Sequence, residues 1–267
     1  MFLKFFSFFL IMYLIYAGII FIFQRKLIYP VHNIIKPFFK TDTSIQKNVI
    51  SFADQKAETW FLPAYSAKGE KTPLLFIAHG NACLIDHWQE MLEKPRKMGF
   101  SAFLVEYPGY GRSLGKPTQQ NITTAFIKAF DVIKENPEID KTKIIFIGRS
   151  LGSGVICSLA REHEPSALIL ISPFTSIKAF AHKFFLPEFL VLDPYDNLSF
   201  LKNFKGPLMV VHGKSDQVIP FSHSQELLRI RPDAFFIGYD TDHNETPPDW
   251  DIFWDNVYDF LKRKGVL

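Results

Sequence analysis

Lys143-Ile-Ile-Phe-Ile-Gly-Arg-Ser-Leu-Gly-Ser-Gly-Val-Ile-Cys-Ser-Leu-Ala160 is the stretch that decides the fold. Its first five residues form an apolar run, rich in β-branched and aromatic side chains, that is typical of a buried strand. Gly148–Gly152 then matches G-x-S-x-G, the nucleophile elbow, in which a sharp strand-to-helix turn exposes a serine hydroxyl. The next residues can form a helix, and Gly152 and Gly154 would let its backbone lie close to neighbouring strands. The stretch therefore predicts strand, turn and helix around Ser150.

The same five residues, Gly-Arg-Ser-Leu-Gly, also occur at Gly111–Gly115. A Pro-Gly pair at 108–109 precedes this copy and marks a loop, and Pro117 disfavours helix at the residue before it. No helix can begin where an elbow requires one. We therefore interpret Ser113 as a loop residue and assign the nucleophile to the other copy.

Outside this stretch, segments that predict strands alternate with segments that predict helices. The predicted strands are 48–53 and 59–62, separated by the polar Asp54–Ala57, then Leu74–Ala78, Ala102–Val105, Ala167–Ile171, Leu208–Val211 and Ala234–Tyr239. The predicted helices are Ile85–Glu93, one from an Asn121 N-cap to Asn136-Pro137, Ser224–Ile230 and Trp250–Lys262. This order predicts the α/β class, with a mainly parallel sheet covered on both faces. Binding groups then collect beyond the carboxyl ends of the strands.

A serine hydroxyl is a poor nucleophile unless a base accepts its proton and a third group orients that base. On this type of sheet the chain order is serine, then acid, then histidine. Of eight histidines, only His223 and His243 follow both Ser150 and a strand end that carries an acid. We favour His243, in the polar loop before the last helix, because His223 follows Pro220 and is expected to open a helix. The alternative for His243 is a surface or capping histidine.

The acid is predicted to be Asp216, in a turn just past a buried strand. Its alternative role is to stabilise that turn through its side chain. Asp193 and Asp196 are rivals, but they lie in an irregular segment. Asp242 stands next to the base and suits a role in stabilising its loop.

The oxyanion that develops during acyl transfer needs two preorganised backbone N–H donors. One is expected from Leu151, directly after the nucleophile, and the other from Asn81, in the loop after the strand that ends at Ala78. Gly80 permits unusual backbone geometry in that loop. His79 is interpreted as a structural hydrogen-bonding residue. This chemistry calls for no metal and no organic cofactor.

The N-terminus carries a long apolar run from Phe5 to Phe23, in which Ser7 is the clearly polar residue. At 1.5 Å per residue the run extends about 28 Å, close to the hydrocarbon thickness of a bilayer. Tyr13 and Tyr16 lie near its middle, which departs from the usual pattern. Gln24-Arg-Lys26 forms a polar stop. The run predicts a single-pass membrane helix.

Two alternatives to a membrane anchor, a signal peptide and a core helix, fit the apolar run less well. A cleaved signal peptide would have a shorter apolar core, about 7 to 15 residues, and Tyr16–Ile19 offers no small-x-small cleavage site. A core helix would carry polar residues on one face. We therefore predict a membrane anchor at 1–26, a linker at 27–46 and the α/β domain at 47–267.

Charge and cysteine content limit which partners and which cellular compartment are plausible. The net charge is +3 without a long basic stretch, so nucleic acid is a poor candidate partner. Cys83 and Cys157 do not suggest an oxidising compartment, and a disulfide between them is not expected. Lys4 precedes the membrane run, whereas four basic residues follow it: Arg25, Lys26, Lys36 and Lys40. By a small margin, the positive-inside rule puts the α/β domain in the cytoplasm.

A set of motifs carries a resemblance to a known family. The motifs are Leu75-Phe-Ile-Ala-His-Gly-Asn-Ala82, Glu106-Tyr-Pro-Gly-Tyr-Gly-Arg-Ser113, Gly148–Gly152, Ser172-Pro-Phe-Thr-Ser176, His212-Gly-Lys-Ser-Asp-Gln-Val-Ile-Pro220 and His243-Asn244. Together they resemble the α/β-hydrolase superfamily. Within it the chain is most similar to membrane-anchored α/β-hydrolase-domain proteins, which have an N-terminal span and a small lid, over roughly residues 20–265.

The resemblance implies an α/β-hydrolase fold with a triad of Ser150, Asp216 and His243, and with Asn81 and Leu151 as oxyanion donors. Some relatives remove fatty acyl groups from protein cysteines, others are esterases, and distant ones are peptidases. In this chain Asp242 and Glu245 flank His243-Asn244, where relatives often carry glycine before the histidine and Asp after the asparagine. That departure concerns the detail of the loop.

The sequence as a whole predicts a serine hydrolase of carboxylic esters or thioesters, acting on a small-molecule or lipid-like acyl substrate. The alternatives are a serine peptidase and a non-catalytic, membrane-tethered scaffold. The segment Pro173–Pro207 is rich in phenylalanine and too short for a large helical lid. It is either a small apolar cap for an acyl chain, dipping into the membrane, or a helix pair packed on the core. Nothing in the sequence fixes the oligomeric state.

Overall fold

An eight-stranded sheet organises the chain in a computed structural model that describes residues 2–31, 34, 42–65 and 69–267. The strand order is β1-β2-β4-β3-β5-β6-β7-β8. The strands are β1 (Gln46–Phe52), β2 (Gln55–Leu62), β3 (Thr72–Ala78), β4 (Ser101–Val105), β5 (Ile139–Arg149), β6 (Ala167–Ile171), β7 (Leu208–Gly213) and β8 (Phe235–Tyr239). Only the pairs β1–β2 and β2–β4 are antiparallel. The predicted mainly parallel sheet is confirmed.

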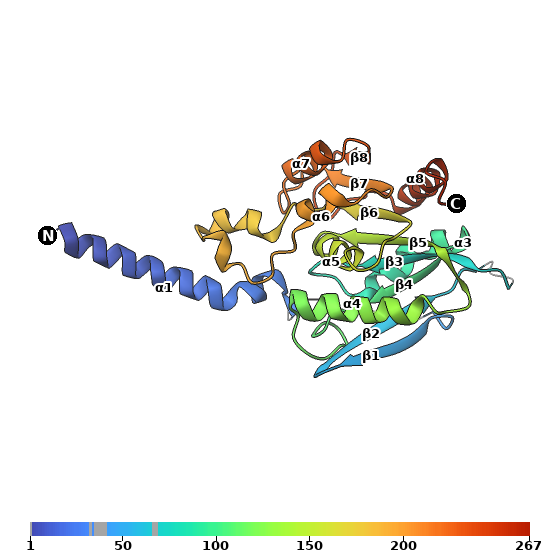
Figure 1. Cartoon of the computed structure of the whole chain (residues 1–267), viewed down its shortest axis with the longest axis horizontal. Coiled ribbons are helices and arrows are strands. Elements are labelled where there is room, and N and C mark those ends of the chain that lie inside the picture. Colours follow the sequence, from blue (N-terminus) through green and yellow to red (C-terminus); the bar gives the residue numbers. More distant parts are fainter. Residues whose placement is uncertain (1, 32–33, 35–41, 66–68) are drawn as a thin grey trace.

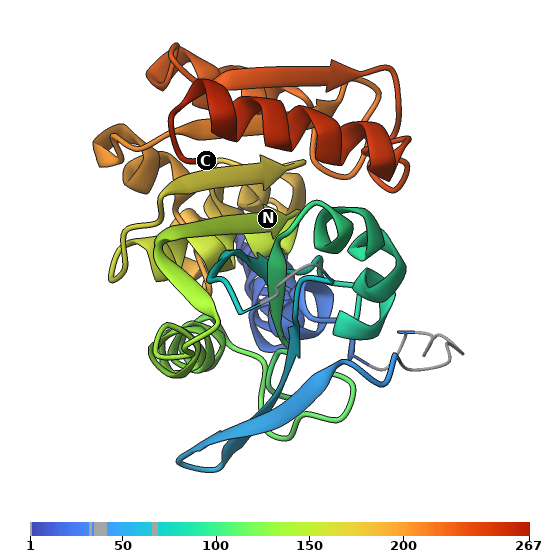
Figure 2. The same cartoon turned by 90° about the vertical axis from the view of Figure 1, so that its right-hand side faces the viewer.

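Helices cover both faces of the sheet, because side chains along each strand alternate between two cores. Phe146 of β5 belongs to one core, and its neighbours Ile145 and Ile147 belong to the other. The first core is closed by α4 (Gln119–Ile133), α5 (Leu151–Ala160), α6 (Asn197–Asn203) and α7 (Ser222–Ile230). The second is closed by η2 (Ile85–His87), α2 (Trp88–Met91), α3 (Glu93–Lys97) and α8 (Trp250–Arg263), on the opposite face (Figure 2).

Three predicted element limits are wrong. The first hairpin turns at Ala53-Asp54, where Ala53 has a φ of 46°, so most of the predicted separator belongs to β2. The N-cap of α4 is Thr118, whose side chain accepts the Asn121 N–H, one turn before the predicted cap. The predicted helix at Ile85–Glu93 is broken into η2, α2 and α3.

α1 (Phe2–Ile28) is a long helix that extends away from the sheet, with the N-terminus of the chain at its far end (Figure 1). Lys4–Ile28 is long and apolar enough to cross a bilayer, the one such helix within the described part of the chain. Only 6% of its most apolar window is buried, which argues against the core-helix alternative. α1 is therefore a candidate membrane span. Nearly half of the predicted linker, at 32–33 and 35–41 and including Lys36 and Lys40, lies outside the described residues.

Two short 3₁₀ helices, η3 (Ile177–Phe184) and η4 (Glu188–Leu190), form a cap that lies beside α1 (Figure 1). We call residues 177–190 the cap. The following α6 packs into the core through Phe200 and Leu201. Two interpretations of Pro173–Pro207 were open from the sequence, a small cap or helices packed on the core. The segment contains both, because the cap is followed by a helix that packs into the core.

The start of α5 lies against the end of β3 with no room for a side chain. A Cβ atom on Gly152 would collide with the backbone carbonyl of Ala78, and one on Gly148 would collide with the carbonyl of Gly152. Gly154 instead faces the side chains of Phe174 and Tyr195. The close approach expected from the sequence therefore depends on Gly152.

Replacing Gly152 with alanine should destabilise the fold despite the higher helix propensity of alanine. The collision involves backbone on both sides, so relief requires α5 to move, and overpacking of this kind costs about 1–3 kcal/mol. Thermal or urea unfolding of the full chain in detergent measures the change. Ser158→Ala on the same helix is the control and should shift stability by no more than about 0.5 kcal/mol. A Gly152→Ala variant as stable as the parent would contradict this account of the elbow.

Candidate active site

Ser150 occupies a strained turn between β5 and α5. Its φ of 53° and ψ of −119° lie outside the regions that non-glycine residues favour. The turn is fixed on both sides, because the Ser150 N–H donates to the Ile171 carbonyl at 2.8 Å and the Ser150 carbonyl accepts the Ser153 hydroxyl at 2.7 Å. This is the strand, turn and helix predicted from the sequence, and it presents the hydroxyl beyond the carboxyl end of β5.

The three side chains predicted as nucleophile, base and acid form one chain of hydrogen bonds. His243 Nε2 lies 3.0 Å from Ser150 Oγ, and His243 Nδ1 lies 2.6 Å from Asp216 Oδ2. A carboxylate only accepts, so Nδ1 carries the proton and Nε2 is free to accept the hydroxyl proton. All three residues are at most 9% exposed. The arrangement can move a proton from the serine to the imidazole.

The Asp216 carboxylate is held in its ionised form by hydrogen bonds. Burial alone would raise its pKa, but hydrogen bonds from His212, His243 and the Ile219 N–H outweigh burial and hold the pKa of Asp216 well below its usual range. Its other oxygen accepts the N–H groups of Val218 and Ile219 at 2.9 and 2.8 Å. A fixed negative charge therefore faces the imidazole.

The rival residues have other partners. The Asp193 carboxylate pairs with Arg25 at 2.8 Å, Asp196 caps α6, and Asp242 accepts the N–H groups that follow His243 in its loop. His223 hydrogen-bonds the Thr175 hydroxyl at 3.0 Å and stacks on a phenylalanine of the cap. Within the described residues, none of the four is hydrogen-bonded to Ser150.

Asn81 and Leu151, the predicted oxyanion donors, both line the cavity that contains Ser150. Within the described residues, the backbone N–H of each has no protein acceptor. The Asn81 loop is held from behind by His79, whose ring stacks on Tyr107 and whose Nε2 lies 2.8 Å from the buried Glu106 carboxylate. His79 thus has the structural role expected of it.

Ser113, in the second Gly-Arg-Ser-Leu-Gly copy, lies in a loop, and the next helix begins at Gln119. Its hydroxyl accepts the Glu58 N–H at 2.9 Å. Arg112 pairs with Glu58 and Asp86. This copy joins the sheet edge to the loop, and within the described residues no histidine is hydrogen-bonded to its serine.

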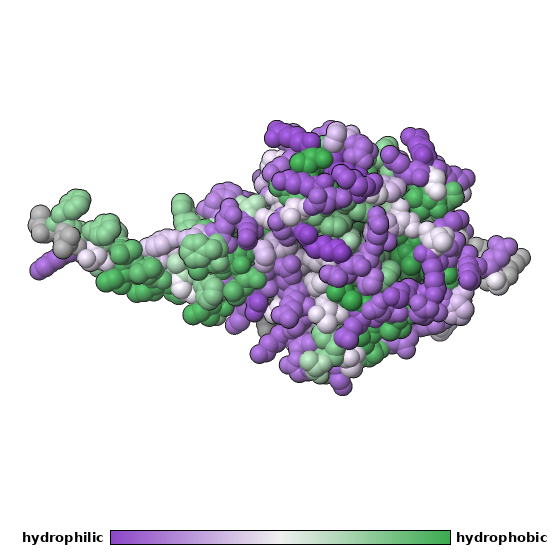
Figure 3. Space-filling model, in the orientation of Figure 1, coloured by the Kyte–Doolittle hydropathy of each residue, from purple (hydrophilic) through white to green (hydrophobic). Residues whose placement is uncertain are grey.

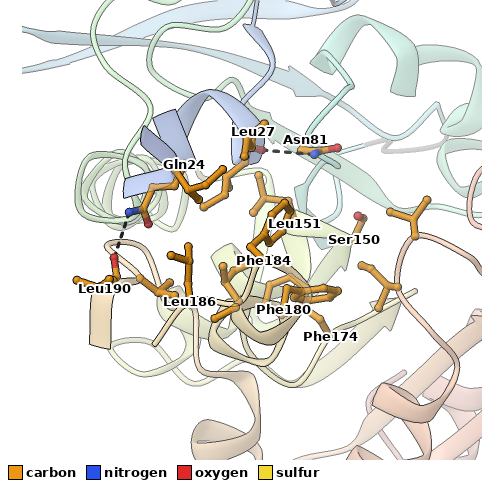
Figure 4. A pocket seen from close by; sticks show the side chains of 17 residues that line it. Gln24, Leu27, Asn81, Ser150, Leu151, Phe174, Phe180, Phe184, Leu186 and Leu190 are labelled. Carbon is orange, nitrogen blue, oxygen red and sulfur yellow. Dashed lines mark hydrogen bonds between the residues drawn. The ribbon is translucent and has the colours of Figure 1, made fainter. Parts of the chain in front are cut away.

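A cavity of about 330 Å³ adjoins Ser150 and lies between α1, the cap and the elbow (Figure 4). Its lining is apolar except for Gln24, Asn81 and Ser150. α1 contributes four lining residues, namely Ile20, Gln24, Leu27 and Ile28. The volume falls in the usual range of small-molecule sites. The cavity suits an apolar group attached to the carbonyl that the serine would attack.

Sequence reasoning missed several residues of this site. His212 Nε2 donates to the Ile219 carbonyl at 2.9 Å and lies 3.2 Å from Asp216 Oδ2, the same oxygen that His243 contacts, so it helps to hold the carboxylate in place. The Arg149 guanidinium donates to the Asn244 carbonyl at 2.9 Å and steadies the His243 loop. Neither role has a local sequence signal. The contribution of α1 to the site did have a sequence signal, since Tyr13 and Tyr16 are unusual in the middle of a membrane-spanning run.

Comparison with known proteins gives matches over most of the chain. The family model of S33 serine aminopeptidases matches residues 69–192. An uncharacterised protein of Mycobacterium tuberculosis is 29% identical over 78% of this chain and 75% of its own length. Lysophosphatidylserine lipase ABHD12 of Rattus norvegicus is 31% identical over 67% of this chain, which spans 49% of the lipase.

Among solved structures, an esterase of Pyrococcus furiosus superposes with a TM-score of 0.66 at 21% identity and covers 86% of this chain and 95% of the esterase. At that identity the likeness concerns the fold. Together with the sheet order, the elbow and the sequence matches, it shows that the chain belongs to the α/β-hydrolase superfamily.

Proposed function

We propose that this hydrolase cleaves carboxylic esters or thioesters with Ser150 as nucleophile, His243 as general base and Asp216 as the orienting acid. The observation that carries the proposal is the continuous hydrogen-bonded chain, 3.0 Å from hydroxyl to imidazole and 2.6 Å from imidazole to carboxylate. Such a chain activates a serine that is otherwise a weak nucleophile.

The reaction then runs in two halves. Ser150 Oγ forms a bond to the acyl carbonyl carbon while His243 Nε2 takes the hydroxyl proton. The same imidazolium returns that proton to the departing alkoxide or thiolate, which leaves as the alcohol or thiol. Water then attacks the acyl carbonyl carbon while His243 Nε2 takes a proton from that water. The imidazolium returns this proton to Ser150 Oγ as the bond from Oγ to the acyl carbon breaks, which releases the carboxylic acid and restores the serine. The Asp216 carboxylate stabilises the imidazolium in both halves.

The carbonyl oxygen becomes negatively charged in each half and needs donors that are already in place. We assign this role to the N–H groups of Asn81 and Leu151. Both are free of protein acceptors, and both residues line the same cavity as Ser150. Because the donors are backbone groups on a helix start and a braced loop, they cost little reorganisation.

Esters and thioesters are favoured over amides by the cavity lining. The wall beside Ser150 is apolar and offers Gln24 and Asn81 as its polar side chains, which suits an acyl chain better than a peptide backbone. A non-catalytic scaffold is disfavoured, because it would have no need of a strained serine aligned with a histidine.

The placement of the protein is part of the proposal. α1 anchors it in a membrane as a single span, and the basic residues that follow the span put the catalytic domain on the cytoplasmic side. Arg25 and Lys26, in the last turn of α1, mark the level of the lipid headgroups.

Replacing Ser150 with alanine should lower p-nitrophenyl butyrate hydrolysis by at least about a thousandfold and abolish labelling by a fluorophosphonate probe, since no acyl-enzyme can form. Ser113→Ala is the matched control, because it removes the serine of the other Gly-Arg-Ser-Leu-Gly copy. That variant should keep its labelling. Retained turnover in Ser150→Ala would mean that the nucleophile is another residue.

Replacing Asp216 with asparagine should lower kcat by about 10²–10⁴-fold, because the amide can hold His243 in the wrong tautomer and cannot stabilise the imidazolium. Folding and the KM of p-nitrophenyl butyrate should change little. Asp242→Asn, in the loop that carries His243, should keep most of the activity. Equal losses in the two variants would indicate a loop effect and remove Asp216 from the mechanism.

A further inference from the structure

α1 is a wall of the substrate cavity as well as an anchor. Ile20, Gln24 and Ile28 follow one face of α1 at four-residue spacing, and all three line the cavity beside Ser150. Ile28 lies at the catalytic end, since its carbonyl accepts the Asn81 side-chain amide at 3.4 Å. Ile20 is about 12 Å farther along the helix. The cavity therefore runs from the serine along the membrane helix.

The second half of the cap and the residues that follow it are hydrogen-bonded to the same helix. The side-chain amide of Gln24 binds the end of η4 through two hydrogen bonds. It donates to the Leu190 carbonyl at 3.1 Å (Figure 4). It also accepts the N–H of Leu192, two residues later, at 2.9 Å. Arg25 pairs with Asp193, whose carboxylate is only 3% exposed. α1 and the cap thus form one structural unit around the cavity.

The tip of the cap, residues 184–189, lies beside the middle of the apolar run of α1. The Tyr16 hydroxyl donates to the Phe184 carbonyl at 3.0 Å, and the Tyr13 hydroxyl donates to the Phe185 carbonyl at 2.9 Å. In hydrocarbon a phenol and a backbone carbonyl are both costly unless they are paired. These two pairs satisfy both requirements, and they explain two tyrosines in the middle of an apolar span.

The side chains at the tip are apolar and exposed. Phe185 is 79% and Phe189 is 81% exposed. The surface of α1, beside which the cap lies, is likewise largely apolar and exposed (Figure 3). A patch of this kind on a water-facing loop is unfavourable, whereas a bilayer leaflet next to α1 would cover it. The charged Lys183 precedes the tip and the charged Glu188 lies within it, and a lysine side chain is long enough to keep its ammonium with the headgroups.

We propose that the tip of the cap inserts into the leaflet around α1, and that the cavity between them receives the long acyl chain of a membrane lipid ester directly from the bilayer. This inference rests on the proposed ester hydrolysis at Ser150 and adds its substrate class and entry route. Ile20 is then a determinant of acyl length, because it stands at the far end of the cavity. Each buried methylene should raise kcat/KM about fourfold until the cavity is filled.

The first test places a larger side chain on α1 so that it fills the end of the cavity far from Ser150. Ile20→Trp in the full chain should lower the ratio of palmitoyl to acetyl p-nitrophenyl ester kcat/KM by about tenfold or more. Ile22→Trp is the control, because Ile22 is 72% exposed and points away from the cavity. It should keep the parent ratio. A ratio unchanged by Ile20→Trp would overturn the role of α1, whereas loss of the Ser150 dependence would overturn the proposed function instead.

The second measurement reports where the tip lies. Tryptophan introduced as Phe185→Trp, in phosphatidylcholine vesicles, should be strongly quenched by lipids brominated on their acyl chains. The difference from the parent isolates this residue from the four native tryptophans. Val132→Trp, at an exposed position on α4, should not be quenched. Equal quenching of the two variants would contradict insertion of the cap.

The source of the acyl chain is tested in the same vesicles. Hydrolysis of 1-palmitoylglycerol with a loss in Ile20→Trp, but not in Ile22→Trp, supports the lipid as substrate. An S-palmitoylated peptide cleaved with a higher kcat/KM than this lipid would overturn that assignment and favour acylated protein.

Discussion

The strained backbone of Ser150 is the constraint on which the rest of the structure depends. A serine with a φ of 53° persists only where its surroundings hold it, and here β6 accepts its N–H while Ser153 binds its carbonyl. The elbow in turn requires a backbone-to-backbone approach between α5 and β3, which glycine at 152 allows. That approach sets Leu151 beside the Asn81 loop. The proposed nucleophile and the proposed oxyanion donors are thus positioned by one packing contact.

Much of this arrangement could be predicted, because it is written locally. The apolar run before Ser150 and the glycines after it specify strand, turn and helix within a single stretch. The alternation of strands and helices then fixes the parallel sheet, and a parallel sheet brings its strand ends to one edge. Asp216 and His243 could be assigned by their positions at such ends, although they lie far from the serine in sequence. The geometry between the three agrees with that assignment.

Other features could not be predicted, because several local solutions are equivalent. Thr118 and Asn121 are both good N-caps, and the path of the preceding loop selects Thr118. The role of His212 depends on where the turn after β7 folds back, which its own neighbours do not determine. α1 is harder still, since a helix that is apolar on all sides gives no periodic sign of the face that another segment will cover.

The contacts of α1 also bear on whether the N-terminus is a cleaved signal peptide. Cleavage after residue 19 would remove Tyr13 and Tyr16 and leave the carbonyls of Phe184 and Phe185 without these donors. Cleavage after residue 24 would also remove Ile20 and Gln24 from the wall beside Ser150, and with Gln24 the side-chain donor to the Leu190 carbonyl. If the cut fell after Arg25, the nearly buried Asp193 carboxylate would lose its partner as well, and an unpaired buried charge is strongly destabilising. A removable leader would not be expected to complete a core of this kind. The packing of the cap against α1 therefore favours a helix that is retained, and it makes this candidate membrane span a part of the domain that carries the candidate site.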